Sequence, residues 1–132
     1  MTVSHIPGRT TATASRETRD FSTPTHVYDI DREVDPIMAE AKRNPSQRAA
    51  TTLSKDGALN VVLMAIAGGA EVPDHRAHGS AIVQVLRGHL RVHFSDADVD
   101  LPSGSAMSLA DGVPHRLAAV TDCAMLLVVA SR

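Results

Sequence analysis

The sequence of 132 residues is poor in aromatic side chains, cysteine and long apolar runs. It has one Tyr, two Phe and no Trp, so its core must be built from aliphatic residues and methionine. A pocket in such a core cannot recognise planar bases by stacking. The single cysteine, Cys123, excludes an internal disulfide framework and fits a reducing compartment. Because Cys123 lies in an apolar run, we interpret it as a small buried hydrophobe rather than a reactive thiol.

Clusters of basic residues and membrane-spanning segments are also lacking. The formal net charge is −2 and the pI is near 6.4, which argues against a nucleic-acid partner. No apolar run approaches the roughly 20 residues that cross a bilayer. The Thr- and Ser-rich first residues lack the apolar segment of a secretory signal. We therefore expect a cytoplasmic protein with no nucleic-acid or membrane partner.

The chain divides into an N-terminal arm and one domain. Residues 1–25 carry little apolar content, which predicts a flexible arm. The length of the remainder, 26–132, suits a single core. Near its start, Asp35 and Pro36 predict a short helix over 36–43, because Asp favours the N-cap and Pro the first helical position.

From residue 48 to 132 the pattern is that of strands joined by turns. Asp56-Gly57 is a hairpin signal, and the apolar run 59–67 has the length of a strand that is buried on both faces. Residues 89–94 alternate, which puts Leu90, Val92 and Phe94 on one face and His89, Arg91 and His93 on the other. No helical pattern interrupts these strands, so we expect an antiparallel sandwich or small barrel.

Three histidines stand in two glycine-containing stretches of this region. His75 and His78 follow Gly68-Gly69 and precede the apolar run 81–86, and His115 follows the turn residues 111–114. Imidazoles at the mouth of a strand, flanked by turn residues, are one way in which a β-barrel carries a metal in its opening.

These two stretches resemble the two sequence motifs of the cupin family. In the first motif, Gly69, His75 and Gly88 are in register, whereas Ala77 stands at the second histidine position, with His78 one residue later. The glutamate position of the motif is occupied by Ala81.

The second cupin motif is matched by Gly104, Gly112 and His115, while Ala110 replaces its proline and Ala119 its asparagine. The resemblance covers about residues 50–132. It implies an all-β, antiparallel jelly-roll barrel, preceded here by the short helix and the arm, with frequent dimerisation. It also implies a mononuclear metal site where the ligands are intact.

The resemblance makes His75, His78 and His115 the candidate metal ligands. In one extended strand, positions 75 and 78 would point to opposite faces, so His78 reaches the same ion only if the chain bends near Gly79. Ala81 has no donor atom, which leaves three imidazoles and water for one divalent transition metal: Zn, Fe, Ni or Mn.

Two residues of the alternating strand are candidates for catalysis. His93 is placed to contact a substrate or to act as an acid or base near neutral pH. Arg91 is a candidate anchor for a substrate carboxylate. Their shared face is either solvent-exposed or the lumen of a polar barrel, and the sequence leaves both alternatives open.

The sequence leaves two functions open. One is a metal-dependent enzyme that acts on a small organic molecule with dioxygenase, cyclase or isomerase chemistry. The other is a non-catalytic barrel whose metal site has decayed and which serves as a small-ligand-binding or regulatory protein. In either case we expect a homodimer, in which the arm or the apolar stretch 124–129 covers exposed sheet edges across a two-fold axis.

Overall fold

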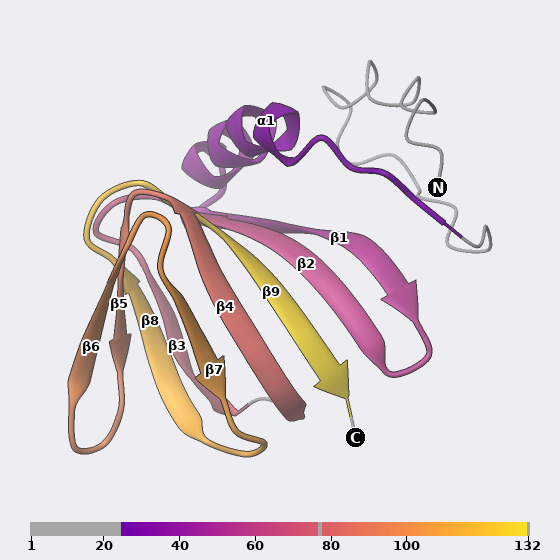
Figure 1. Cartoon of the computed structure of the whole chain (residues 1–132). Helices are drawn as coiled ribbons and strands as arrows, with labels where there is room; N and C mark the ends of the chain where they lie inside the picture. Colours follow the sequence, from indigo (N-terminus) through magenta and orange to yellow (C-terminus); the bar gives the residue numbers. More distant parts are fainter. Residues whose placement is uncertain (1–24, 77, 132) are drawn as a thin grey trace.

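The computed structural model describes residues 25–76 and 78–131, except for the side chain of His75. This part of the chain holds one helix and two antiparallel sheets (Figure 1). Its elements are α1 (Ile30–Arg43), β1 (Arg48–Asp56), β2 (Leu59–Ile66), β3 (Glu71–Arg76), β4 (Gly79–Arg87), β5 (His89–His93), β6 (Asp98–Pro102), β7 (Ala106–Leu109), β8 (Pro114–Ala119) and β9 (Cys123–Ser131).

The two sheets face each other around the main core. One has the strand order β1-β2-β9-β4-β7 and the other β3-β8-β5-β6. Buried and exposed residues alternate along β4, so that Val83 and Val85 point inward, where they join Val92 and Leu117 of the opposite sheet in one apolar cluster. The antiparallel jelly-roll predicted from the sequence is confirmed.

Helix α1 covers the outer face of the five-stranded sheet over β1, β2 and β9 (Figure 1). Ile37 and Ala41 of the helix are fully buried, and they cluster with Leu63 and Ala65 of β2. Ile66 points to the opposite side, into the core between the sheets. The apolar run 59–67 is therefore covered on both faces over residues 63–66, whereas Leu59 at its start is exposed.

The helix ends at Arg43, as predicted, but it begins at Ile30 rather than at residue 36. Asp29 is the N-cap, and its side chain accepts a hydrogen bond from the backbone N–H of Arg32. Pro36 lies inside the helix and has no N–H to donate to the carbonyl of Arg32. The helix therefore runs through Pro36 with one backbone hydrogen bond fewer.

The C-terminal apolar stretch has a different role from the one predicted. Residues 124–129 belong to β9, whose backbone is paired with β2 on one side and β4 on the other. A strand bonded on both sides cannot cover a sheet edge, so this part of the dimer prediction is wrong.

The predicted N-terminal arm and the predicted absence of membrane segments concern residues that the structure describes only in part. Apart from Thr25, the arm predicted over 1–25 lies outside the described residues. In the part of the chain that is described, no helix is long and apolar enough to cross a membrane.

Candidate functional site

A cavity of about 280 Å³ lies inside the barrel. Most of its wall is aliphatic and comes from β4, β7, β8 and β9, with Ala81, Val83, Leu109, Leu117, Leu127 and Val129 as the lining residues. Its polar groups are those of Asn60, His78, His115 and Ser131. The cavity is thus an apolar space with a few polar side chains, as small-molecule sites commonly are.

His115 is the most deeply placed of these polar groups. It lies near the start of β8, and only 5% of its surface is exposed. Its Nδ1 is 2.9 Å from the backbone carbonyl of Val113. A carbonyl only accepts hydrogen bonds, so Nδ1 carries the hydrogen, and in the neutral ring the lone pair lies on Nε2. This is the tautomer of a metal-binding imidazole whose other nitrogen is oriented by a backbone acceptor.

The backbone brings the other two predicted ligands to the same end of the barrel. His75 is paired directly with His115 in the ladder between β3 and β8. β3 ends at Arg76 and β4 begins at Gly79, so His78 lies in the connection rather than in one extended strand with His75. His78 lines the cavity together with His115. The difficulty raised by strand periodicity therefore does not apply to His78.

Binding of a single ion by the three imidazoles stays a prediction. Among the described side chains, which leave out that of His75, no group of three His, Cys, Asp or Glu is arranged to hold a metal. Ala81, at the glutamate position of the cupin motif, is buried and lines the cavity without a donor atom.

Two polar residues of the cavity were not among those predicted. The Asn60 Nδ2 donates to Ser131 Oγ at 3.2 Å, across the two strands at the cavity wall. Asn60 is the one amide in the apolar run 59–67, and a polar residue within an apolar strand is the sequence feature that could have indicated it. Its partner is 71 residues away, so the pairing could not be read from the sequence.

The structure places Arg91 and His93 on the outer face of the four-stranded sheet. Their neighbours Leu90 and Val92 are the residues of β5 that point into the core. Arg91 Nε donates to Asp100 at 2.7 Å, and this hydrogen bond lowers the pKa of Asp100 and raises that of Arg91. The two candidate catalytic residues therefore do not line the barrel cavity.

The structure agrees with the interpretation of Cys123 as a small buried hydrophobe. Cys123 is fully buried within the core between the sheets. Burial raises the pKa of its thiol to about 12, so the nucleophilic thiolate is not populated near neutral pH.

Three solved structures with this fold share little sequence with the chain. A cupin superfamily protein from Desulfitobacterium hafniense is 19% identical with a TM-score of 0.64, over 67% of this chain and 82% of that one. A conserved protein of unknown function from Streptococcus pyogenes is 22% identical with a TM-score of 0.64, over 86% and 93%. A protein of unknown function from Rhizobium leguminosarum is 16% identical with a TM-score of 0.66, over 83% and 100%. At these identities the likeness establishes the fold.

No curated protein matches the chain. The model of the cupin domain family matches residues 62–130, which is more than half of the 132 residues and includes both stretches that carry the three histidines. The chain belongs to the cupin family.

Proposed function

We propose that this protein is a small metal-binding cupin that acts on a small organic molecule. His75, His78 and His115 would hold one divalent transition metal, Zn, Fe, Ni or Mn, in the mouth of the barrel. One observation carries the proposal: His78 and His115 line the same cavity, and the backbone of His75 is paired opposite His115.

The donor set fits such an ion. The hydrogen bond from His115 Nδ1 to Val113 leaves the Nε2 lone pair as the metal-binding position of that ring. Three neutral imidazoles with a position left for water or substrate are a common set for zinc and also suit other late divalent metals. When bound, the metal would polarise a carbonyl or activate water or O₂.

The cavity walls define the kind of molecule that could be accepted. A volume of about 280 Å³ lies near the lower end of small-molecule sites, which span roughly 300–1,000 Å³. The aliphatic residues would exclude water around an apolar body. The Asn60–Ser131 pair would orient one polar substituent, since it is held by its own hydrogen bond. Dioxygenase, cyclase and isomerase chemistry all fit this arrangement, and the fold does not choose among them.

Metal analysis of protein purified without an affinity tag or added metal tests the proposal. We expect about one transition-metal ion per chain, with strong loss of metal in His75→Ala and His115→Ala, because removing one of three ligands weakens a site by far more than tenfold. His93→Ala is the matched control, since His93 lies outside the cavity, and it should keep its metal. Folded protein that lacks metal and takes up no added Zn²⁺, Ni²⁺ or Fe²⁺ would rule out the metal site.

A non-catalytic ligand-binding barrel is the second candidate. It is favoured by Ala81 and Ala119, which stand buried at the glutamate and asparagine positions of the motifs and offer no polar atoms. The same metal analysis separates the two candidates. In the second case a small apolar ligand should still raise the thermal midpoint of the metal-free protein, and replacing Leu127 in the cavity wall by a larger residue should abolish that shift.

We also propose that the protein forms a homodimer through the outer face of its five-stranded sheet. Beyond the part covered by α1, this face exposes Leu59 and Ile82, whose exposed fractions are 43% and 49%. Between them lie the half-buried Val61 and Val128, which are paired with each other in neighbouring strands. A second copy would bury this apolar strip across a two-fold axis.

A further inference from the structure

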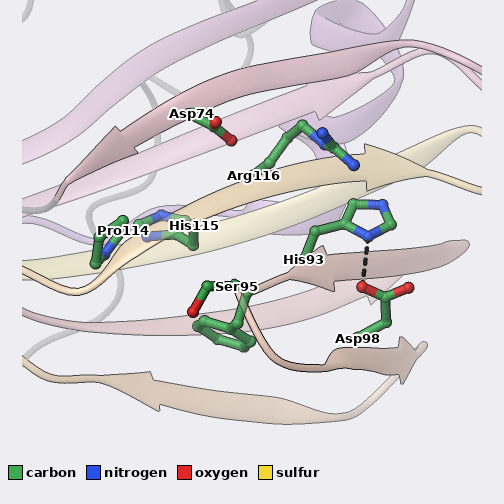
Figure 2. A pocket seen from close by; sticks show the side chains of 8 residues that line it. Asp74, His93, Ser95, Asp98, Pro114, His115 and Arg116 are labelled. Atoms are coloured by element: carbon green, nitrogen blue, oxygen red, sulfur yellow. Dashed lines mark hydrogen bonds and ion pairs between the residues drawn. The ribbon is translucent and has the colours of Figure 1, made fainter.

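A second recess, of about 440 Å³, lies at the rim and outer face of the four-stranded sheet (Figure 2). It is separate from the barrel cavity, and the two share only His115 in their walls. The polar side chains that the recess gathers come from β3, β5, β6, β8 and the turn after β5: Asp74, His93, Ser95, Asp98, His115 and Arg116.

Four of these side chains form one row across the sheet. His93 is paired with Arg116 on one side and with Asp98 on the other, and Asp74 lies beyond Arg116 on β3. The next residue along β8, Leu117, points into the core, so the row belongs to the outer face. Neighbouring strands are about 4.8 Å apart, which places two carboxylates, one imidazole and one guanidinium at close spacing.

The imidazole of His93 is fixed in one orientation. Its Nδ1 lies 2.7 Å from Asp98 Oδ1, and since a carboxylate accepts, Nδ1 carries the hydrogen when the ring is neutral. That leaves Nε2 as an acceptor with no hydrogen-bond partner among the described residues. Because the hydrogen bond to Asp98 already immobilises this imidazole, accepting a hydrogen bond from a ligand hydroxyl costs little further side-chain entropy.

Arg116 supplies donors above this ring. Its Nε is buried beside Glu71 Oε1, at 3.4 Å, so the donors that a ligand can reach are those at the end of the guanidinium. Figure 2 shows its guanidinium beside the imidazole of His93. Ser95 lies on the other side of the recess with its Oγ turned away from the imidazole, so no nucleophile is aligned with His93 and Asp98. The arrangement suits binding.

The charges and shapes select the class of ligand. Two carboxylates and one guanidinium leave the recess with one negative charge when His93 is neutral, which disfavours small anions. Interspersed donors and acceptors match hydroxyl groups, because each hydroxyl can donate and accept. Phe94 and Pro114 add apolar surface for C–H groups. We propose that this recess is a second binding site, for a neutral polyhydroxylated molecule of about monosaccharide size.

The test is calorimetric or NMR titration of the full chain with D-glucose, D-mannose, D-galactose and myo-inositol, and with inorganic phosphate and acetate. We expect at least one polyol to bind in a 1:1 ratio, and Asp98→Asn to weaken it about tenfold, since a neutral amide is a weaker hydrogen-bond acceptor than a carboxylate. Asp100→Asn is the matched control: Asp100 lies on the same strand and face but does not line the recess, so binding should be unchanged.

His78→Ala separates this site from the barrel cavity, because His78 lines only the latter. Polyol binding that survives this substitution and is weakened by Asp98→Asn supports the proposal, whether or not the protein binds metal. Three results would overturn it: no polyol binding at about 50 mM, where a millimolar site is filled; binding of phosphate or acetate in place of polyols; or loss with His78→Ala and not with Asp98→Asn.

Discussion

At the scale of single residues, the glycines of the cupin motifs are required for two different reasons. Gly88 has a φ of +81°, and a Cβ atom built there would lie 1.9 Å from the backbone oxygen of Asp122. Gly104 has a similar φ of +90°, but a Cβ there would meet no atom within 4 Å. Gly88 is needed for close approach of two backbones as well as for its conformation, whereas Gly104 is needed for its conformation alone.

We predict that Gly88→Ala destabilises the protein well beyond Gly104→Ala. Each substitution pays about 1–2 kcal/mol for a left-handed conformation. Gly88→Ala adds an overlap with backbone that only a shift of the strands relieves, about 1–3 kcal/mol more. Urea unfolding of both variants measures the difference. Equal losses in the two variants would show that the overlap is relieved without cost.

At this scale the sequence predicted which histidines could form a metal site, and physical reasons explain which features of the cavity it could not predict. His75 and His115 could be assigned to different strands because their motifs carry turn glycines in register, but that these strands are neighbours is seen only in the structure. The position of His78 depended on where β3 ends, and a strand end is set by pairing with β8 rather than by local preference. Asn60 and Ser131 meet only because β9 pairs with β2, a contact between distant parts of the chain.

At the scale of elements, the carboxylate of Asp122 ties helix α1 to the barrel. It lies 2.6 Å from Lys42 Nζ in the last turn of α1, and it accepts a hydrogen bond of 2.8 Å from the backbone N–H of Gly68. These two contacts, that with Lys42 first, hold the pKa of Asp122 below its usual value. The loops at residues 68 and 122 are thereby joined to the helix that covers the sheet.

We predict that this link is lost in acid. A carboxyl group with a lowered folded-state pKa stabilises fully above its unfolded pKa, about 3.9, and loses that effect as the pH falls through the folded value. Because both side chains are about half exposed, the link contributes roughly 0.2–1 kcal/mol. Asp122→Asn should be less stable than the unmodified protein by that amount at pH 7, and the two should converge as the pH falls below the lowered folded-state pKa of Asp122.

Thermal unfolding between these pH values measures the convergence. Asp96→Asn is the control, since Asp96 is exposed in the turn between β5 and β6 and has no ion pair among the described residues. Its stability should follow the unmodified protein throughout. A deficit of Asp122→Asn that stays constant down to the lowest pH would show that the carboxylate acts through its shape rather than its charge.

The helix itself shows where element boundaries escape the sequence. Asp35-Pro36 has the composition of a helix start, yet the chain uses the Asp29 cap, because the residues between them include Val34, which is buried against the sheet. Burial of that apolar surface outweighs the loss of one hydrogen bond at Pro36. Tertiary packing, which a local signal does not contain, determined the start of the helix.

At the scale of the whole molecule, the proposed dimer makes a clear prediction. Ile82→Asp should shift sedimentation velocity from a dimer to a monomer, since a charge placed in the apolar strip would have to be buried unpaired. Val120→Asp is the matched control: Val120 is equally exposed, at 47%, but lies in the turn between β8 and β9. A monomer already in the unmodified protein, or dissociation of both variants alike, would contradict the assignment of this face.

The place of β9 also determines when this barrel can form during synthesis. β2 and β4 are not bonded to each other; each is bonded to β9, which is the last of the described strands to be made. A growing chain that has not yet released residues 123–131 from the ribosome has a five-stranded sheet in two separate pieces, each with an open edge. Formation of the complete sheet must therefore wait for that segment, and until then those two edges are open to pairing with other chains.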